Sequence, residues 1–266
     1  MRVKSGSRWP EDGKWEVIIS QTLRTLTLAI SWNTIINDLN HELAQLTFND
    51  PVTTIYNPLE YARRAHNQFI RRFGAGTKEA IFLGMNPGPY GMAQTGVPFG
   101  DITHIRDWLK IKGPIDHPQI EHPKRPIQGF DCPRSEVSGR RLWGFFKEKF
   151  GEPEAFFKRF FVVNYCPLVF MEESGKNRTP DKLPAHEREA LFAICDLALE
   201  RIVDRLQPQL IIGVGRFATE RANAALRKHP VSIGTILHPS PASPAANRGW
   251  AETAERQLQA LGLRLP

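Results

Sequence analysis

The sequence contains little cysteine. Its 266 residues include only Cys132, Cys166 and Cys195, which are far apart and form no C-x-x-C pair. A framework of disulfides is therefore not expected, and three thiolates are one ligand short of the four that hold an iron–sulfur cluster. Free thiols of this kind are typical of a protein in a reducing compartment.

Long apolar runs are also missing. The apolar stretch near the N-terminus, residues 17–30, is interrupted by Ser20, Gln21 and Arg24, and no A-x-A-like cleavage site follows it. A membrane span needs about 20 consecutive apolar residues, so neither a span nor a secretory signal is expected. Residues 1–34 carry no motif and are expected to be an extension outside the fold, whereas residues 35–266 are expected to form one domain.

Motifs for metals and cofactors are absent or incomplete. The chain has no H-E-x-x-H, and no H-x-E combined with P-C-x-x-C, which excludes the zinc protease and zinc deaminase sites that use them. The segment Gly213–Ala218 matches the G-x-G-x-x-A pattern of dinucleotide-binding folds. Those folds place an acidic residue about 20 positions further on to hold the ribose, and no Asp or Glu lies between Arg221 and Ala251. We therefore expect a tight strand-to-helix turn here, and neither a metal nor a cofactor.

Positive charge is in excess. Lys and Arg number 35 against 28 Asp and Glu, which gives a net charge of +7 and an isoelectric point of about 9.5. This balance suits a polyanionic partner such as nucleic acid, although basic proteins without such a partner are common. With 41% apolar residues, the chain is also able to bury a full core.

Strand and helix patterns alternate along the chain. Short apolar runs predict four strands, at residues 80–83, 160–164, 209–213 and 231–237. Helical patterns cover residues 58–73, 101–109, 137–150, 184–206, 217–229 and 244–261, with Asn57 and Ser243 as expected caps. Strands that alternate with helices predict an α/β fold in which a parallel sheet is covered on both faces.

Polar side chains stand at the ends of three of these strands. Asn86 lies in the loop Gly84–Pro89, Asn164 ends the second strand, and His238 opens the loop His238–Pro241. Ligands of open parallel sheets bind at the carboxyl ends of the strands, where these three side chains are expected to meet. Each of them alone is more often a turn former or a structural side chain. The set contains neither a Ser or Cys nucleophile with a base nor a pair of carboxylates.

The two loops also carry a family resemblance. The 17-residue segment Gly84–Gly100, together with His238–Pro241 and Ala246–Trp250, resembles the signature motifs of the single-strand-selective monofunctional uracil-DNA glycosylases, a branch of the uracil-DNA glycosylase superfamily. Further similarity lies at Ile55–Tyr61, His122–Pro126, Ser135–Gly139, Trp143–Phe146, Asn164–Leu168 and Val214–Arg216, so that it spans roughly residues 36–263. The resemblance implies a three-layer α/β/α fold with a central, mainly parallel, four-stranded sheet. It also implies base excision repair, in which uracil or 5-hydroxymethyluracil is flipped out of DNA and removed by hydrolysis, without lyase activity.

The resemblance implies two catalytic residues. His238 would donate a hydrogen bond to O2 of the departing base, which carries negative charge as the glycosidic bond breaks. Asn86 stands where other branches of the superfamily have an Asp. Because an amide cannot remove a proton at neutral pH, Asn86 would only position the water, and bond cleavage is expected to run ahead of water attack.

The resemblance also implies a base pocket. Phe99 would stack on the flipped base, and the amide of Asn164 would pair with O4 and N3–H of uracil. The backbone N–H of Met85 would assist as a donor. Gly88 would leave space beside C5 of the base for a water or a hydroxymethyl group.

Several residues are expected to contact the DNA itself. In the family, a loop that corresponds here to Ser240, Pro241, Ala242 and Ser243 enters the duplex and fills the gap left by the flipped base. The candidate phosphate contacts are basic, namely Lys124, Arg125, Arg140, Arg141 and Arg248, although such residues often form only a solvated surface. An Arg is usual in the family where Ala242 stands, and a Lys where Arg248 stands. A methyl group cannot fill a base-sized gap, so activity on duplex DNA is expected to suffer more than activity on single strands.

Together these features lead us to expect a monomeric hydrolase that acts on uracil or modified uracil in single- and double-stranded DNA, with no cofactor. Its expected location is the cytoplasm, with the nucleoid, in a bacterium and the nucleus in a eukaryote. One alternative is a non-catalytic binder of single-stranded or damaged DNA, which only a turnover assay separates from an enzyme. Another is an enzyme of the same fold that acts on free nucleosides, for which the basic surface would serve no purpose.

Overall fold

The computed structural model describes residues 30–266, and a four-stranded parallel sheet forms its centre. The strands are β2 (Ala80–Gly84), β3 (Phe160–Asn164), β6 (Leu210–Val214) and β7 (Ser232–Ile236), in the order β3-β2-β6-β7. Each lies within one residue, at either end, of a strand that the sequence predicts. All residues of β2 and β6, the two central strands, are buried, as expected where helices cover both faces.

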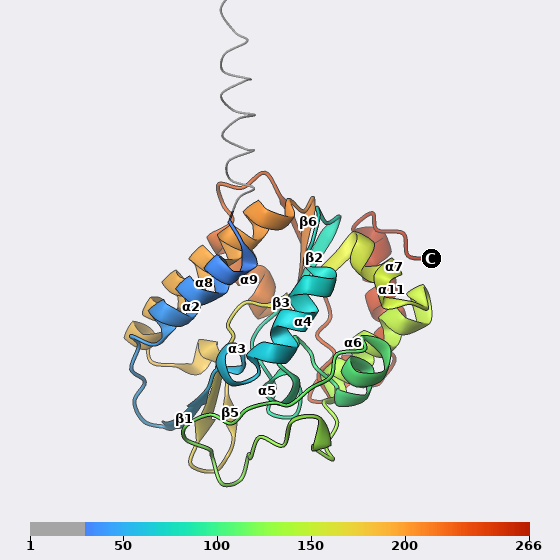
Figure 1. The fold of residues 1–266 in the computed structure, drawn as a ribbon. Helices are drawn as coiled ribbons and strands as arrows, with labels where there is room; N and C mark the ends of the chain where they lie inside the picture. The colour runs from blue at the N-terminus through green and yellow to red at the C-terminus, as the bar shows by residue number, and fades with distance from the viewer. Residues whose placement is uncertain (1–29) are drawn as a thin grey trace, which may run out of the picture.

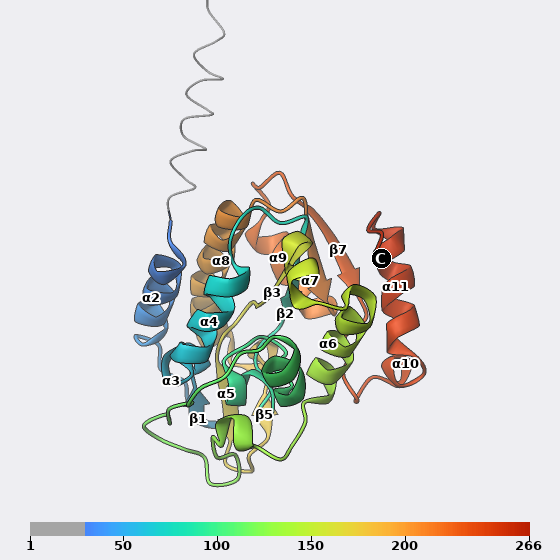
Figure 2. The same ribbon diagram turned by 45° about the vertical axis from the view of Figure 1, so that its right-hand side comes forward.

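Helices cover both faces of this sheet and confirm the three-layer α/β/α arrangement (Figure 1, Figure 2). One face carries α2 (Trp32–Leu43), α8 (Ala185–Leu206) and α9 (Arg216–Ala225), and the other carries α6 (Val137–Phe150), α7 (Pro153–Arg159) and α11 (Trp250–Ala260). The α4 helix (Arg63–Phe73) packs beside β3, where the Phe69 ring stacks on Phe161 with 5.1 Å between centroids.

Phenylalanine side chains fill the layer between the sheet and α6–α7. The Phe82 and Phe146 ring centroids lie 4.9 Å apart, and those of Phe146 and Phe156 lie 4.3 Å apart. Each such ring removes about 150–250 Å² of surface from water, and each pair adds about 0.5–1.5 kcal/mol beyond that burial. The strand ends that carry the expected site are therefore supported by a closely packed hydrophobic layer.

A small antiparallel sheet, which the sequence pattern does not predict, lies beyond the carboxyl ends of the main sheet (Figure 1). Its strands are β1 (Val52–Tyr56), β4 (Val169–Glu172) and β5 (Asn177–Arg178), in the order β1-β4-β5. Only residues 165–168 separate β3 from β4, which holds the small sheet next to the expected site.

Two predicted helices are each divided in the structure. Residues 58–73 form α3 (Pro58–Tyr61) and α4, with Ala62 between them, and Asn57 caps α3 as predicted. Residues 244–261 form α10 (Pro244–Asn247), capped by Ser243, and α11. Gly249 interrupts the second pair because its φ of +124° is incompatible with a continuous helix.

The remaining elements are short. The predicted helix at 101–109 has a π-helical turn, η1 (His104–Trp108), as its main part. The other short elements are α5 (Met92–Thr95), η2 (Gly129–Asp131) and η3 (Pro180–Lys182).

The fold begins earlier than the sequence predicts. The α2 helix starts at Trp32, so residues 32–34 belong to the domain and not to the expected extension. The Trp32 indole Nε1 donates to the Gly74 carbonyl at 2.7 Å and its ring contacts Phe161. Residues 1–29 lie outside the described residues, so the extension expected there stays a prediction. Within residues 30–266, no helix combines the length and the apolar character needed to cross a membrane.

Candidate active site

The loop that follows β2 holds Asn86 with its amide in a fixed orientation. Asn86 Nδ2 donates to the Leu168 carbonyl at 3.1 Å, and the Cys166 backbone N–H donates to the Met85 carbonyl at 2.9 Å. These bonds join the loop to the chain that leaves β3, the neighbouring strand. The bond from Nδ2 orients the amide, and Oδ1, the acceptor atom of the side chain, is left to accept a hydrogen bond from a water.

Gly84 allows Asn164 and Phe99 to approach each other. Gly84 and Asn164 are paired neighbours at the ends of β2 and β3. A Cβ on Gly84 would lie well under 3.0 Å from Asn164 Oδ1 and 2.6 Å from Phe99 Cε2, so a side chain does not fit there. The Asn164 Nδ2 lies 3.3 Å from the sulfur of Met92, a weak acceptor that helps to orient the amide. One hydrogen-bonding amide and one aromatic ring therefore stand side by side at the end of β2.

The Phe99 backbone adopts an unusual conformation. Its φ is +54°, in the left-handed region that residues other than glycine rarely adopt. Gly139 in α6 packs so closely that a Cβ on it would lie well under 3.0 Å from the Phe99 carbonyl oxygen. The Trp143 indole also donates to the Pro98 carbonyl at 3.3 Å. Strain of this kind persists only where the surroundings impose it, and it concentrates at functional sites.

His238 lies at the end of β7, beside Phe99. The two ring centroids are 6.1 Å apart. Gly215, with a φ of +91°, brings the end of β6 so close that a Cβ on it would be 3.0 Å from His238 Cβ. Glycine at this point of the G-x-G-x-x-A segment is thus accounted for by the turn into α9 and the approach of His238.

The His238 imidazole is neutral at pH 7. Burial lowers the pKa of His238 to about 4, because desolvation disfavours the charged ring. Within residues 30–266, neither ring nitrogen of His238 has a hydrogen-bond partner. A neutral imidazole carries one N–H, which leaves a donor available to a ligand beside Phe99.

Gly88 packs against the carboxylate of Glu136. A Cβ on Gly88 would lie well under 3.0 Å from Glu136 Oε2, so the direction in which a side chain would project is already filled. Burial raises the pKa of Glu136, while hydrogen bonds from the backbones of Tyr90 and Ser138 oppose that rise. A side chain at position 88 would therefore have to displace Glu136.

Arg141 holds the loop that follows His238. Its Nη1 donates to the carbonyls of Pro239 at 3.1 Å and Ser240 at 3.4 Å, and its Nη2 donates to Asn247 Oδ1 at 2.8 Å. The tip of this loop, with Pro241 and Ala242, is exposed. Arg141 is therefore engaged with its own chain, whereas the sequence predicts a phosphate contact for it.

The other basic candidates lie in segments around the same edge of the sheet (Figure 2). Arg140 at the start of α6 and Arg248 after α10 are exposed, and neither forms an ion pair or side-chain hydrogen bond within residues 30–266. Among the described residues, the exposed Lys124 side chain donates only to the Glu173 carbonyl, at 3.5 Å. These three cations are available to a polyanion. Ser243 is occupied as the cap of α10, and its Oγ accepts from the Ala246 backbone.

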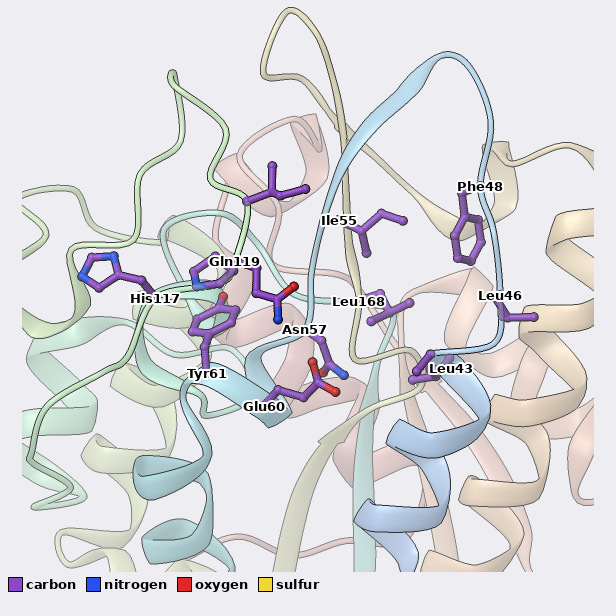
Figure 3. A pocket seen from close by; sticks show the side chains of 13 residues that line it. Leu43, Leu46, Phe48, Ile55, Asn57, Glu60, Tyr61, His117, Gln119 and Leu168 are labelled. Atoms are coloured by element: carbon purple, nitrogen blue, oxygen red, sulfur yellow. The ribbon is translucent and has the colours of Figure 1, made fainter.

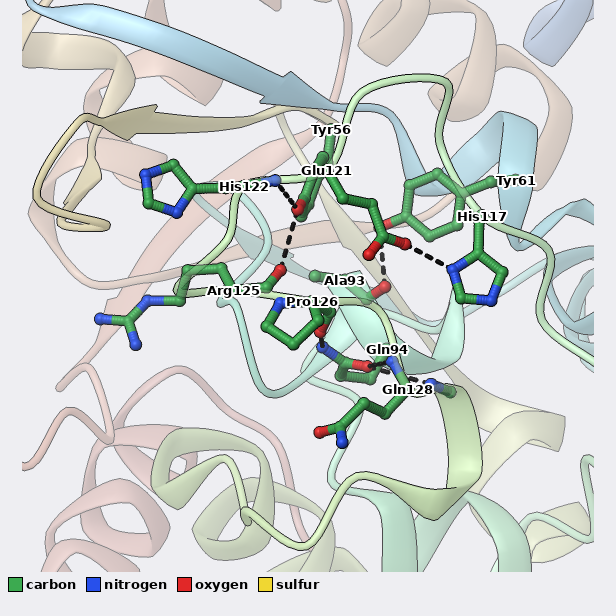
Figure 4. Close-up of polar contacts among 11 residues, drawn as sticks. Tyr56, Tyr61, Ala93, Gln94, His117, Glu121, His122, Arg125, Pro126 and Gln128 are labelled. Carbon is green, nitrogen blue, oxygen red and sulfur yellow. Dashed lines mark hydrogen bonds and ion pairs between the residues drawn. The ribbon is translucent and has the colours of Figure 1, made fainter.

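Gln94 connects the loop after β2 to the long segment that carries Lys124 and Arg125. Its Nε2 donates to the carbonyls of Pro89 at 3.0 Å and Pro126 at 3.1 Å (Figure 4). Its Oε1 accepts from the backbones of Gln128 at 2.8 Å and Gly129 at 3.0 Å. The side chain is buried with all four hydrogen-bonding positions used, which fixes two otherwise irregular loops against each other.

A hollow of about 550 Å³ lies next to this site but is separate from it (Figure 3). It lies between the end of α2, β1, α3 and the segment around Ile120, and apolar side chains such as Leu43, Phe48 and Ile55 contribute much of its wall. Leu168, whose carbonyl accepts from Asn86, also lines it. None of the candidate site residues contributes to its wall.

The sequence does not predict the roles of Gln94, Glu136 and Arg141. Gln94 lies inside the motif Gly84–Gly100 and Glu136 inside Ser135–Gly139, so the motifs mark their importance without showing what they touch. Apart from Pro89 and Ser138, their partners lie 32 to 106 positions away along the chain, which no local pattern reveals.

Comparisons with known proteins identify the family of this chain. The model of the uracil DNA glycosylase superfamily matches residues 72–260. Single-strand selective monofunctional uracil DNA glycosylases from Mus musculus and Rattus norvegicus are 53% and 54% identical over 227 residues, which cover 85% of this chain and 81% and 82% of theirs. The chain belongs to this glycosylase family.

A solved structure shows the same fold in a more distant protein. The crystal structure of wild-type Pedobacter heparinus SMUG2 superposes with a TM-score of 0.58 at 18% identity, covering 86% of this chain and 97% of that one. The family-model match at residues 72–260 includes both strand-end loops and all four strands of the parallel sheet.

Proposed function

We propose that this protein removes uracil and 5-modified uracils, including 5-hydroxymethyluracil, from single- and double-stranded DNA by hydrolysis of the N-glycosidic bond. The product is an abasic site, the protein acts as a monomer, and its place of action is the nucleoid or the nucleus. One observation supports the proposal above the others. The Asn164 amide and the Phe99 ring come together at Gly84, and the neutral His238 imidazole lies beside Phe99. Asn86 follows Gly84 by two positions in the same loop.

Base recognition rests on Phe99 and Asn164. A flipped uracil stacks on the Phe99 ring, and the Asn164 amide donates to O4 and accepts from N3–H. Cytosine presents an amino group and an unprotonated N3 at the same places, which leaves the amide unpaired and disfavours binding. The Met92 sulfur takes up only one N–H of Asn164 Nδ2, so the second stays available to the base.

Catalysis rests on His238 and Asn86. As the glycosidic bond breaks, negative charge develops on the base, and the His238 N–H donates to O2 where that charge collects. Loss of one such donor typically costs on the order of 10²–10³ in rate. The Asn86 Oδ1 accepts from the attacking water, and because Asn86 does not take up its proton, cleavage of the bond precedes water attack.

The exposed loop after His238 enters the duplex, with Arg141 as its support. Ala242 at the tip provides a methyl group only, so the loop stabilises a flipped base in duplex DNA poorly. Single strands need no such support, and we expect faster removal of uracil from them. Lys124, Arg140 and Arg248 add contacts to phosphates that do not depend on sequence.

The test is a cleavage assay on end-labelled oligonucleotides that carry one uracil, 5-hydroxymethyluracil, cytosine or thymine, developed with and without hot alkali. We expect breaks at uracil and 5-hydroxymethyluracil only, and only after alkali, with the single strand cut faster than the duplex. Free deoxyuridine, assayed in parallel, should stay intact. Binding to DNA without any cleavage would replace the proposal with a non-catalytic DNA binder, and hydrolysis of the free nucleoside alone would replace it with a nucleoside hydrolase.

A further inference from the structure

Two arginines converge on the side chain of Tyr90, at the end of the loop that carries Asn86. Arg125 Nη1 and Arg134 Nη1 both donate to the Tyr90 phenol oxygen, the latter at 2.5 Å. Both guanidinium groups also lie over the ring, with their central carbons 5.3 Å and 4.9 Å from its centroid. The Arg125 guanidinium points away from Gln94, whose hydrogen bonds hold Pro126 and Gln128 in the same segment (Figure 4).

No carboxylate neutralises this pair within residues 30–266. Neither Arg125 nor Arg134 forms an ion pair there, and the further bonds of Arg125 go to neutral carbonyls, including that of Gly175 at 2.8 Å. The Glu136 carboxylate accepts from the Tyr90 backbone, but it is directed into the protein against Gly88. Two positive charges are therefore held next to one another, which is unfavourable unless an anion binds between or beside them.

The donors that remain suit a tetrahedral oxyanion. A phenol has two lone pairs and one proton, and the two arginines occupy both lone pairs, so the Tyr90 proton is left to donate outward. Arg134 is exposed and uses one of its five guanidinium N–H groups within residues 30–266, whereas the half-buried Arg125 uses three and keeps the two of Nη2. Arginine N–H pairs match the oxygen spacing of a phosphate group.

We propose that Arg125, Tyr90 and Arg134 form a phosphate subsite that binds one phosphodiester of the DNA strand next to the flipped nucleotide. The proposal rests on the proposed function for the identity of the ligand. Its place follows from the chain itself, since Tyr90 lies four positions after Asn86 in one short loop. Phosphate contacts position a protein on DNA without reading its sequence, and this one sets the distance between the strand and the base pocket.

The first experiment measures binding to a single-stranded oligonucleotide that carries a tetrahydrofuran abasic analogue, which has no glycosidic bond to cleave. Fluorescence anisotropy gives the Kd at several salt concentrations for the wild type, Arg134→Ala and Tyr90→Phe. The control is Arg227→Ala, which removes an exposed charge between α9 and β7, at the opposite end of the sheet. We expect about tenfold weaker binding for Arg134→Ala, with a salt slope reduced by about 0.7 for each lost phosphate contact. Tyr90→Phe should keep most of the slope, and Arg227→Ala should change neither value.

The second experiment replaces single phosphates of the same oligonucleotide by neutral methylphosphonates, one position at a time. One position should weaken binding of the wild type but not of Arg134→Ala, because the contact is already missing. If every position affects both proteins equally, the two arginines only brace the Tyr90 loop and the subsite proposal is wrong. If the position-specific coupling is present while no oligonucleotide is cleaved, the subsite stands and the proposed glycosylase activity fails. Thermal unfolding of each variant confirms that it is folded.

Discussion

Replacement of Gly84 by alanine tests whether one glycine assembles the base pocket. The added Cβ would lie under 3.0 Å from both Asn164 Oδ1 and Phe99 Cε2, a distance that real Cβ contacts essentially never show. Phe99 is 9% exposed and held from behind by Gly139, and Asn164 is fixed at the end of β3, so the two side chains must move apart. Overpacking of this kind costs about 1–3 kcal/mol of stability. A displacement of about 1 Å in positioning groups, by contrast, costs on the order of 10² in rate.

The expected result is a Gly84→Ala protein that is folded but nearly inactive. The assay is single-turnover cleavage of a uracil oligonucleotide, with thermal unfolding measured on the same preparation. Gly144→Ala in α6 is the matched control, since its nearest neighbour would be His104 Nε2 at an ordinary 3.6 Å. A Gly84→Ala protein with the wild-type rate and an unchanged unfolding midpoint would refute the argument that Gly84 is required for this arrangement.

Three further predictions concern residues around the pocket and in the core. Gly88→Ala should lower the rate of 5-hydroxymethyluracil removal about tenfold more than the rate of uracil removal, because the new methyl displaces Glu136 and shifts the loop beside C5 of the base. A competition assay that gives the wild-type ratio of these two rates would contradict this prediction. Arg141→Ala should slow uracil removal from duplex DNA about tenfold and from single strands much less, because it frees the loop that enters the duplex. Arg227→Ala is the control. Equal losses of rate on duplex and single-stranded DNA would argue against a role of Arg141 in holding this loop. Burial lowers the pKa of His66 to about 4, against about 6.5 in an unfolded chain. Between these two pH values the unfolded state binds more protons than the folded state, so the free energy of unfolding falls as the pH falls from about 6.5 to about 4. Urea unfolding at pH 7 and pH 4.5 should show a loss of about 2.5 kcal/mol from this residue. A His66→Gln protein with the same pH dependence as the wild type would rule out His66 as the cause.

The parallel sheet is predictable from the sequence because its strands are buried on both faces. The run Ala80–Gly84 has no residue that faces water, and such short apolar runs between turn signals are distinctive. The antiparallel sheet is not predictable in the same way. Its strand Val169–Glu172 is four residues long and is defined by pairing with Val52–Tyr56, more than a hundred positions earlier, so no local pattern marks it.

In the site, too, local sequence patterns mark the candidate residues but not the distant residues that hold them in place. Strand ends and motifs single out Asn86, Asn164 and His238 as candidates, because each lies at the end of a strand that the pattern locates or within two residues of it. The groups that hold these residues depend on tertiary contacts. The π-helical turn at His104–Trp108 and the break at Gly249 likewise reflect packing that overrides helical periodicity.

We propose that Asn86 acts on the water and not on DNA binding, and one comparison tests this most directly. Wild type and Asn86→Ala are assayed for alkali-dependent cleavage of a single-uracil strand, and for binding to the same strand with an abasic site. We predict breaks with the wild type, nearly none with Asn86→Ala, and equal binding of the abasic product by both proteins. Cleavage by Asn86→Ala at the wild-type rate, or an equal loss of cleavage and binding, would contradict the account.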